Sequence, residues 1–376
     1  MPKMTVYPVG NADTSLLDLA NGEKILFDFA NYHDPKKRDE KRIDLAEALR
    51  EDLRRANRKN YDVVAFTHLD DDHIHGATDF FELSYSKTYQ GKNSAGKDRV
   101  GIKTLWVPAA AIIEENLPEE ARIIQKEARA RLRNGANIRV FSRPDSLKDW
   151  LRDNGLSVQA RKNLIIDAGT LIPDFTTSAH GVEFFVHSPF AEHAEDGGVV
   201  QRNKGALVLQ ATFTCAGQVA RVLLGADIDH EVLDDIVRIT RHRGRDERLL
   251  WDVFKIPHHC SYKSLGPVQG TKITTPVPHV GWLYEKQGQK RGILVASSWP
   301  IPSNDDDPQP PHRQAAAYYD KQAARLTGHF LVTMAHPTEV SPEPVVITID
   351  HLGATPKKPG LRGGAYVTGV PAPRAG

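Results

Sequence analysis

The strongest constraint on this fold is a buried strand that ends directly in a cluster of histidines and aspartates. Residues 61–67 (YDVVAFT) are largely apolar and β-branched, which is typical of a strand buried on both faces of a sheet. Three histidines and three aspartates then fall within eight residues, in the order His68-Leu69-Asp70-Asp71-Asp72-His73-Ile74-His75. Adjacent carboxylates raise one another's pKa unless cations compensate. The pattern therefore favours a divalent-metal site at a strand end over an acidic surface turn.

Strand-like and helix-like segments recur in both halves of the chain. We expect strands at residues 5–9, 15–19, 24–29 and 102–107, and in a second group at 182–187, 206–213, 218–225, 253–256 and 293–297. Helices are expected at 43–53, 114–132, 230–241 and 314–326, the first with leucines spaced four residues apart. This order predicts an α/β (α+β) fold in which two sheets are sandwiched between helices.

We interpret residues 1–352 as one domain. The range of about 109–163 contains little that resembles chemistry, and we expect it to be a helical insertion or cover that could contact a protein partner. Residues 353–376 are rich in Gly and Pro and contain no acidic residue, so we expect a flexible basic tail.

Composition narrows the chemistry. The 49 Lys and Arg residues balance 48 Asp and Glu residues, so no global field would draw the chain onto nucleic acid or an anionic membrane. Two cysteines cannot build a disulfide framework or a thiolate cage, which leaves His and carboxylate as metal ligands. We find no leader-like segment and no apolar run of membrane-spanning length, and we expect a cytoplasmic protein without membrane contact.

The cluster resembles the His-x-His-x-Asp-His motif of the metallo-β-lactamase superfamily, with Asp70 where the second histidine usually stands. The form His-x-Asp-x-Asp-His is similar to the metallo-β-lactamase domain of ComEC-type DNA-uptake proteins. Further segments that agree with this family, in order, are Val9–Asp13, Ile25–Asp28, Leu223–Asp227, Phe254–Ser261 and, more loosely, Asn304–His312. The resemblance covers roughly residues 5–350, apart from the insertion and the tail. It implies a four-layer αββα metallo-β-lactamase sandwich.

The resemblance also implies roles for individual residues. His68 and Asp70 would bind one metal ion, and Asp72, His73 and His259 the other, with Asp227 bridging the two. The ions would be divalent, Zn or Mn, and a hydroxide held between them would be the nucleophile. Catalytic roles are expected for His258 and His312, and for Asp72 in addition to its role as a ligand. Substrate contacts are expected for Asn203, Ser261 and Lys263.

Several positions stay open at this point. The third-motif histidine of the superfamily has no clear equivalent, so either Asn203 or His187 could complete the first metal site, while His187 could equally be a core histidine. Cys260 replaces the usual glycine after His259, either as a packed thiol or as a soft ligand. His75 is expected beside the site or on a helix surface.

For the substrate, the resemblance and the carboxylate-rich ligands favour a phosphodiesterase or nuclease acting on nucleic acid or a nucleotide. Basic residues that could follow a phosphate backbone are Lys87, Lys92, Lys97, Arg99, Lys263 and Lys272. The acidic run at 305–307 would repel DNA, which keeps a small nucleotide in consideration. The alternatives are a hydrolase of carboxylic esters, lactones or thioesters on the same fold, and an inactive partner protein.

Overall fold

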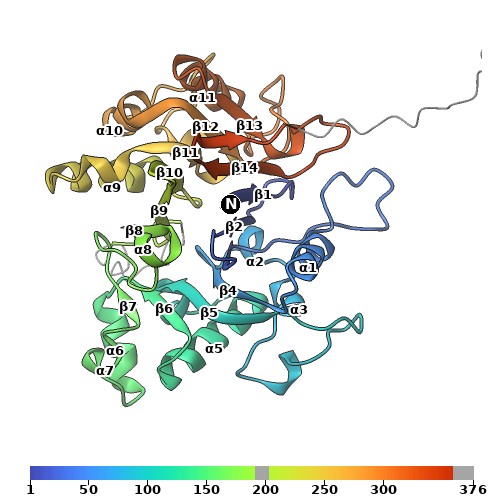
Figure 1. Cartoon of the computed structure of the whole chain (residues 1–376), viewed down its shortest axis with the longest axis vertical. Coiled ribbons are helices and arrows are strands. Elements are labelled where there is room, and N and C mark those ends of the chain that lie inside the picture. The colour runs from blue at the N-terminus through green and yellow to red at the C-terminus, as the bar shows by residue number, and fades with distance from the viewer. Residues whose placement is uncertain (191–202, 359–376) are drawn as a thin grey trace, which may run out of the picture.

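Two β-sheets packed face to face form the centre of the molecule (Figure 1). The structure is a computed structural model, which describes residues 1–190 and 203–358. In these ranges the first sheet has nine strands, β1 (Lys3–Val6), β2 (Ser15–Asp18), β3 (Lys24–Phe27), β4 (Asn60–Ala65), β5 (Gly101–Pro108), β6 (Ile138–Phe141), β7 (Ile165–Ile166), β14 (Val345–Asp350) and β15 (Gly353–Pro356). The second has six, β8 (Val182–Ser188), β9 (Val208–Cys215), β10 (Gln218–Leu224), β11 (Trp251–Lys255), β12 (Gly288–Ala296) and β13 (His329–Val332).

Each sheet has an antiparallel part and a parallel part. The first runs in the order β15-β14-β1-β2-β3-β4-β5-β6-β7, and its strands are parallel from β3 to β7. The second runs β13-β12-β11-β10-β9-β8, and its strands are parallel from β10 to β13. Because parallel strands end at the same edge, loops that follow several strands of one sheet meet there.

Helices cover the outer face of each sheet. The described helices that follow strands of the first sheet are α1 (Leu45–Arg55), α2 (Asp71–Ile74), α3 (Ala77–Phe80), α4 (Ala110–Ile113), α5 (Glu119–Asn134), α6 (Asp145–Asp153) and α7 (Val158–Arg161). Those in the second half are α8 (Thr177–His180), α9 (His230–His242), α10 (Pro278–Trp282) and α11 (Arg313–Arg325). In Figure 1, α9, α10 and α11 lie on one side of the strands, and α1, α5 and α6 lie on the other.

Three hydrophobic cores separate the layers. One lies between the first sheet and helices such as α1 and α5, one between the two sheets, and one between the second sheet and α9, α10 and α11. Strand β4 contributes Val64 to the first core and Val63 and Ala65 to the second, so it is buried on both faces as its sequence predicts. The predicted fold class, two sheets between layers of helices, is confirmed.

Local sequence explains where the helices begin. Asp44 precedes α1 and its side chain accepts a hydrogen bond from the Glu47 N–H at 3.0 Å, while Leu45, Leu49 and Leu53 form the buried face. Asp229 caps α9 in the same way, with bonds from the N–H groups of the second and third helical residues.

Two ranges differ from the expected organisation. The range 109–163 contains helices α4 to α7, but it also contains β6, which pairs with β5 and extends the first sheet. It is therefore not a purely helical insertion. The expected tail begins with strand β15, which pairs antiparallel with β14 after a turn at residues 351–352. Residues 359–376 lie outside the described residues. Within the described chain, no helix has the length and apolar character needed to cross a bilayer.

Candidate metal centre

The predicted ligands follow the ends of strands in both sheets. The cluster that begins at His68 follows β4, Asp227 follows β10, and His259 follows β11. The two sheets face each other, so these loops meet at one edge of the sandwich. The ligand atoms of Asp72, His73, Asp227 and His259 all lie within 4.8 Å of one another.

Asp227 lies at the centre of this cluster. Its Oδ1 is 3.3 Å from Nε2 of His73, and its Oδ2 is 3.1 Å from Nε2 of His259. The same His259 nitrogen is 3.1 Å from Oδ2 of Asp72. The two carboxylate oxygens of Asp227 thus face two different histidines, which places Asp227 at the centre of the candidate ligands.

His68 and Asp70 lie beside the cluster. The ring centroids of His68 and His73 are 3.9 Å apart, and Nε2 of His68 is 3.7 Å from Oδ2 of Asp70. His68 is 3% exposed, whereas the side chains of Asp70 and Asp72 are each 32% exposed. The site is therefore closed on its histidine side and open to solvent at these two carboxylates.

Asp28 orients His73 from below. Its Oδ2 accepts hydrogen bonds from Nδ1 of His73 at 2.8 Å and from the Thr67 hydroxyl at 2.8 Å, and its Oδ1 accepts the Thr67 N–H at 2.7 Å. Asp28 adopts a left-handed backbone conformation with φ 56°, which Asp tolerates better than most residues. A carboxylate behind a ligating histidine fixes the tautomer, so that Nε2 faces the ion.

His259 is aimed by a strained turn. His258, His259 and Cys260 have φ values of 52°, 52° and 65°, a region that costs non-glycine residues energy. Nδ1 of His259 donates to the carbonyl of Ser297 at 2.8 Å, which leaves Nε2 for Asp72 and Asp227. Backbone strain of this kind persists where the surroundings enforce it, and it is typical of functional sites.

The charges of the cluster match a site built for cations. Burial opposes protonation of His259, but the Asp227 and Asp72 carboxylates outweigh burial and raise its pKa to about 10. Burial would also raise the pKa of Asp227, yet His259 and His73 hold that pKa well below its usual range. Protons on the histidines thus balance the carboxylates, and a divalent ion would displace those protons.

Unpartnered buried atoms also fit metal ions. Nε2 of His73 and Oδ1 of Asp227 are buried and, among the described residues, neither has a hydrogen-bond partner. Such groups are rare in folded proteins unless a water or an ion satisfies them. Imidazole nitrogen and carboxylate oxygen are the donors that Zn(II) and Mn(II) accept. The residues present therefore fit a metal centre.

Asp13 and Lys255 lie beneath the cluster, and sequence reasoning gave them no role. The Lys255 ammonium forms an ion pair with Asp13, and both side chains are almost fully buried. Oδ2 of Asp13 is 4.0 Å from Nε2 of His73. Both residues occur in the segments that carry the family resemblance, as does Asp28, and that was the available signal.

Three predicted catalytic or substrate-binding residues after β11 differ in their surroundings: His258, Ser261 and Lys263. His258 is half-buried, its Nδ1 has no hydrogen-bond partner in the described chain, and burial lowers its pKa. The Ser261 hydroxyl accepts the N–H of Lys263 at 3.3 Å, so it caps the next turn. The Lys263 side chain is exposed, and its charge contributes to lowering the pKa of His258.

Cys260 packs into the core between the second sheet and its helices, and it is fully buried. Burial raises the pKa of its thiol, which favours the packed-thiol interpretation over the ligand interpretation.

His312 anchors a loop. It accepts a hydrogen bond from the Tyr262 N–H at 3.4 Å through Nδ1 and donates to the Pro308 carbonyl at 3.3 Å through Nε2. Its backbone N–H donates to the carbonyl of Cys260 at 3.1 Å. Both ring nitrogens therefore have internal partners, and a direct catalytic role for His312 stays a prediction.

The two candidates for the missing ligand lie in different places. Nε2 of His187 donates to the carbonyl of Arg248 at 2.9 Å, and the side chain lines a separate cavity rather than the metal cluster. Asn203 is four residues before Leu207 in the sequence. The N–H of Leu207 donates to the carbonyl of Thr67, next to the cluster, at 2.9 Å. Asn203 as a ligand or substrate contact stays a prediction.

His75 lies at the rim of the site. Its ring stacks on Tyr32 with centroids 4.1 Å apart, and Nδ1 is 3.2 Å from Oδ1 of Asp71. Asp71, His75 and Glu120 form a second, more exposed group of potential metal ligands. His75 and Asp71 thus point away from the cluster around Asp227.

The basic loop after α3 is partly neutralised. Lys97 pairs with Glu47 at 2.9 Å, and Arg99 is 3.8 Å from Asp79 with its guanidinium 7% exposed. Lys87 and Lys92 are exposed. Two of the four cations in this loop that were expected to follow a phosphate backbone are therefore used within the protein. Near the site, Asp305 of the acidic run is paired with Arg313, which reduces the repulsion expected from that run.

Comparisons with known proteins give matches among solved structures only. No family model matches the chain, and no curated protein matches its sequence. Among solved structures, unliganded yeast PDE1 is 11% identical with a TM-score of 0.39, over 88% of this chain and 97% of that one. A diphosphatase of the PhnP family is 11% identical with a TM-score of 0.35, over 93% and 98%. The di-zinc metallo-β-lactamase LRA-12 from an Alaskan soil metagenome is 10% identical with a TM-score of 0.31, over 86% and 88%. At this level of similarity, function is argued from the residues of the site.

Proposed function

We propose that this protein is a metal-dependent hydrolase with a dinuclear centre, and that its substrate is a phosphodiester. The observation that carries the proposal is the cluster around Asp227: the ligand atoms of Asp72, His73, Asp227 and His259 lie within 4.8 Å of one another, and the ring of His68 lies 3.9 Å from that of His73. Asp227 would bridge the ions, His68 and Asp70 would hold one, and Asp72, His73 and His259 would hold the other.

Divalent ions held there would supply Lewis acidity, which lowers the pKa of water and stabilises charge that develops on phosphoryl oxygens. The chain's own contribution is orientation. Asp28 fixes the ring of His73, the Ser297 carbonyl fixes the ring of His259, and the half-exposed Asp72 forms the side that a substrate approaches.

Two features support a phosphodiester over a carboxylic ester. The ligand set contains three aspartates, and hard oxygen donors suit the ions that are common in phosphoryl chemistry. Lys263 is exposed at the turn that carries His258 and His259, where an ammonium could contact a phosphate. Lysine binds phosphate as a point charge, and this requires no particular geometry.

His258 is the proposed proton donor to the leaving oxygen. It adjoins the ligand His259, and burial lowers its pKa, so its imidazolium, once formed, would release a proton readily to the leaving oxygen. Its unpartnered Nδ1 is available for a substrate. General acid or base groups typically contribute about 10²–10⁴ in rate. His258→Gln should therefore lower kcat by about that factor while both metals stay bound.

The first experiment is metal content by mass spectrometry, followed by Mn(II)- and Zn(II)-supplemented assays on single-stranded DNA, double-stranded DNA and bis-p-nitrophenyl phosphate. Asp227→Ala should lose both metals and all activity, because one residue serves two ions. Asp71→Asn is the matched control: it is the same residue type in the same motif, but it contacts Tyr32 and His75 outside the cluster. It should keep both metals.

The outcomes separate the alternatives. Cleavage of the polymers establishes a nuclease, and cleavage of the small diester alone indicates a phosphodiesterase of small nucleotides. Metal without either activity, combined with turnover of an ester, lactone or thioester, would replace the phosphodiester proposal. Normal metal content and turnover in Asp227→Ala would refute the bridging role.

A further inference from the structure

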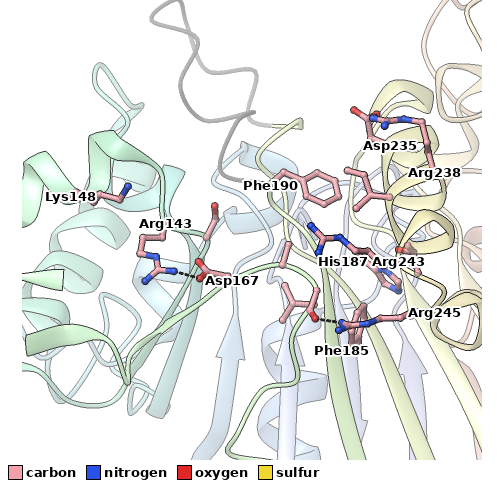
Figure 2. A pocket seen from close by; sticks show the side chains of 16 residues that line it. Arg143, Lys148, Asp167, Phe185, His187, Phe190, Asp235, Arg238, Arg243 and Arg245 are labelled. Carbon is pink, nitrogen blue, oxygen red and sulfur yellow. Dashed lines mark hydrogen bonds and ion pairs between the residues drawn. The ribbon is translucent and has the colours of Figure 1, made fainter. Parts of the chain in front are cut away.

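A cavity of about 630 Å³ lies at the ends of strands β6, β7 and β8, apart from the metal cluster. Figure 2 shows Arg143 and Lys148 on one wall and Arg238 and Arg243 on the other, with His187 between them. One wall belongs to the first sheet and α6, and the other to α9 and the loop after it. The cavity is therefore a gap between the two halves of the sandwich at their open edge.

Cations dominate the lining of this cavity. Its described charged residues, His apart, are Arg143, Lys148, Asp167, Asp235, Arg238, Arg243 and Arg245. Arg143 pairs with Asp167 at 2.5 Å, and Arg238 pairs with Asp235. Arg245 donates to the Gly169 carbonyl at 2.6 Å and keeps its positive charge. Lys148 also pairs with Asp145, so three of the five lining cations are paired with carboxylates. Arg243 and Arg245 carry the remaining positive charge, which attracts anions.

The floor holds buried polar atoms without partners. Ser142 and His187 line the cavity, and the Ser142 hydroxyl and Nδ1 of His187 are buried atoms without a hydrogen-bond partner among the described residues. His187 is 2% exposed and donates through Nε2 to the carbonyl of Arg248, so Nδ1 is left as an acceptor. Buried groups of this kind require a partner. A ligand that brings both donors and acceptors would satisfy them.

Aromatic surface completes the cavity. Phe185 and Phe190 both line it, and Phe185 contacts the ring of His187 edge-on with centroids 5.0 Å apart. Aromatic faces accept stacked bases, and a basic groove with such faces is the usual arrangement for single-stranded nucleic acid.

The cavity lies on the same edge as the metal cluster. Strands β4 to β7 are parallel, and β8 is antiparallel to β9, which is antiparallel to β10. The strand ends that carry the cavity and those that carry the ligands therefore face the same way. The strands that carry the two sites in the first sheet, β4 and β6 or β7, are two or three strand spacings apart, roughly 10–15 Å. A stacked strand that advances about 3.4 Å per nucleotide covers this distance in about three to four nucleotides.

We propose that this cavity binds the flank of a single-stranded nucleic acid whose scissile phosphate lies at the metal cluster. Arg243 and Arg245 would contact the backbone phosphates, and Phe190 would stack on a base. At the edge of that base, the Ser142 hydroxyl would donate a hydrogen bond and Nδ1 of His187 would accept one. The proposal rests on the proposed function for the position of the scissile bond, but binding to the cavity can be measured without catalysis.

The test uses the full chain and the double variant Arg243→Ala/Arg245→Ala. Binding of a fluorescein-labelled ten-nucleotide oligothymidylate is measured by anisotropy on chelator-treated protein, over a range of salt. Loss of two phosphate contacts should weaken binding at least about tenfold at low salt and reduce the slope of log K against log salt by about 1.4. The matched control is Lys286→Ala/Lys290→Ala, which removes two exposed cations elsewhere and should bind as the wild type does.

Activity gives an independent readout on metal-loaded protein. The double variant should hydrolyse bis-p-nitrophenyl phosphate with unchanged kcat/KM, and its kcat/KM for the ten-nucleotide strand should fall about as much as its affinity. In the wild type, affinity should rise with length from two to about five nucleotides and then level off.

Several results would overturn the proposal. These are absence of binding by the wild type, equal loss in the two double variants, or competition by a nucleoside diphosphate as strong as that by the ten-nucleotide strand. A wild type that binds the strand through Arg243 and Arg245 but hydrolyses no phosphodiester would instead contradict the proposed function and leave the binding site established.

Discussion

Nδ1 of His73 donates a hydrogen bond to Oδ2 of Asp28 at 2.8 Å, and this contact turns Nε2 of His73 towards Asp227. Asp28→Asn keeps the shape of the side chain and tolerates the left-handed backbone at φ 56°. It removes the charge that fixes the ring, so metal affinity should fall about 10–100-fold. Calorimetric titration of Zn(II) or Mn(II) measures this change. Asp62→Asn is the control, because Asp62 is also a buried aspartate that accepts a backbone N–H, at the opposite end of β4. Equal loss of metal affinity in both variants would contradict the role of Asp28 in orienting His73.

His187 should make stability depend on pH. Burial lowers its pKa from 6.5 to about 4, outweighing the hydrogen bond to the Arg248 carbonyl. The folded protein therefore holds the neutral ring, so its contribution is complete above pH 6.5 and is lost as the pH falls towards 4. The difference corresponds to about 3 kcal/mol at most. His187→Gln keeps a donor for Arg248 and does not titrate, so its urea-unfolding free energy should fall less between pH 7 and pH 4.5. Parallel pH profiles of the two proteins would show that His187 does not titrate in this range.

Cys260 should be dispensable for metal binding. Its thiol is buried in the core against α11, and burial raises its pKa, so it does not present a thiolate. Cys260→Ala should keep both metals and lower the free energy of unfolding by about 1 kcal/mol through lost apolar burial. Cys215→Ala, at a partly exposed position, should change neither quantity. Loss of one metal in Cys260→Ala would identify the thiol as a ligand.

The buried ion pair between Lys255 and Asp13 should show strong coupling. Lys255→Met leaves the Asp13 carboxylate buried without a cation, which typically costs about 3–5 kcal/mol. The double variant Asp13→Asn/Lys255→Met removes both charges and should recover most of that loss. Denaturant unfolding of metal-free protein completes the cycle. Additive effects of Lys255→Met and Asp13→Asn on the free energy of unfolding would show that the two charges do not stabilise each other.

Much of the architecture follows from local sequence. The apolar run of β4 predicts a strand buried on both faces, and the leucine spacing in α1 predicts the helix that covers it. The density of His and Asp after β4 predicts a metal site before any tertiary contact is known. The fold predictions succeed because hydrophobic periodicity acts between residues that are close along the chain.

Tertiary structure decided which distant residues complete the site and which candidates do not. Lys255 reaches Asp13 across 242 positions, and Asp28 reaches His73 across 45, so no local pattern reports either contact. Strand order also determines that β6 belongs to the first sheet and that His187 lines a cavity separate from the metal cluster. The physical reason is that sheet pairing brings loops together according to strand direction and order, and these are set by the packing of the whole chain.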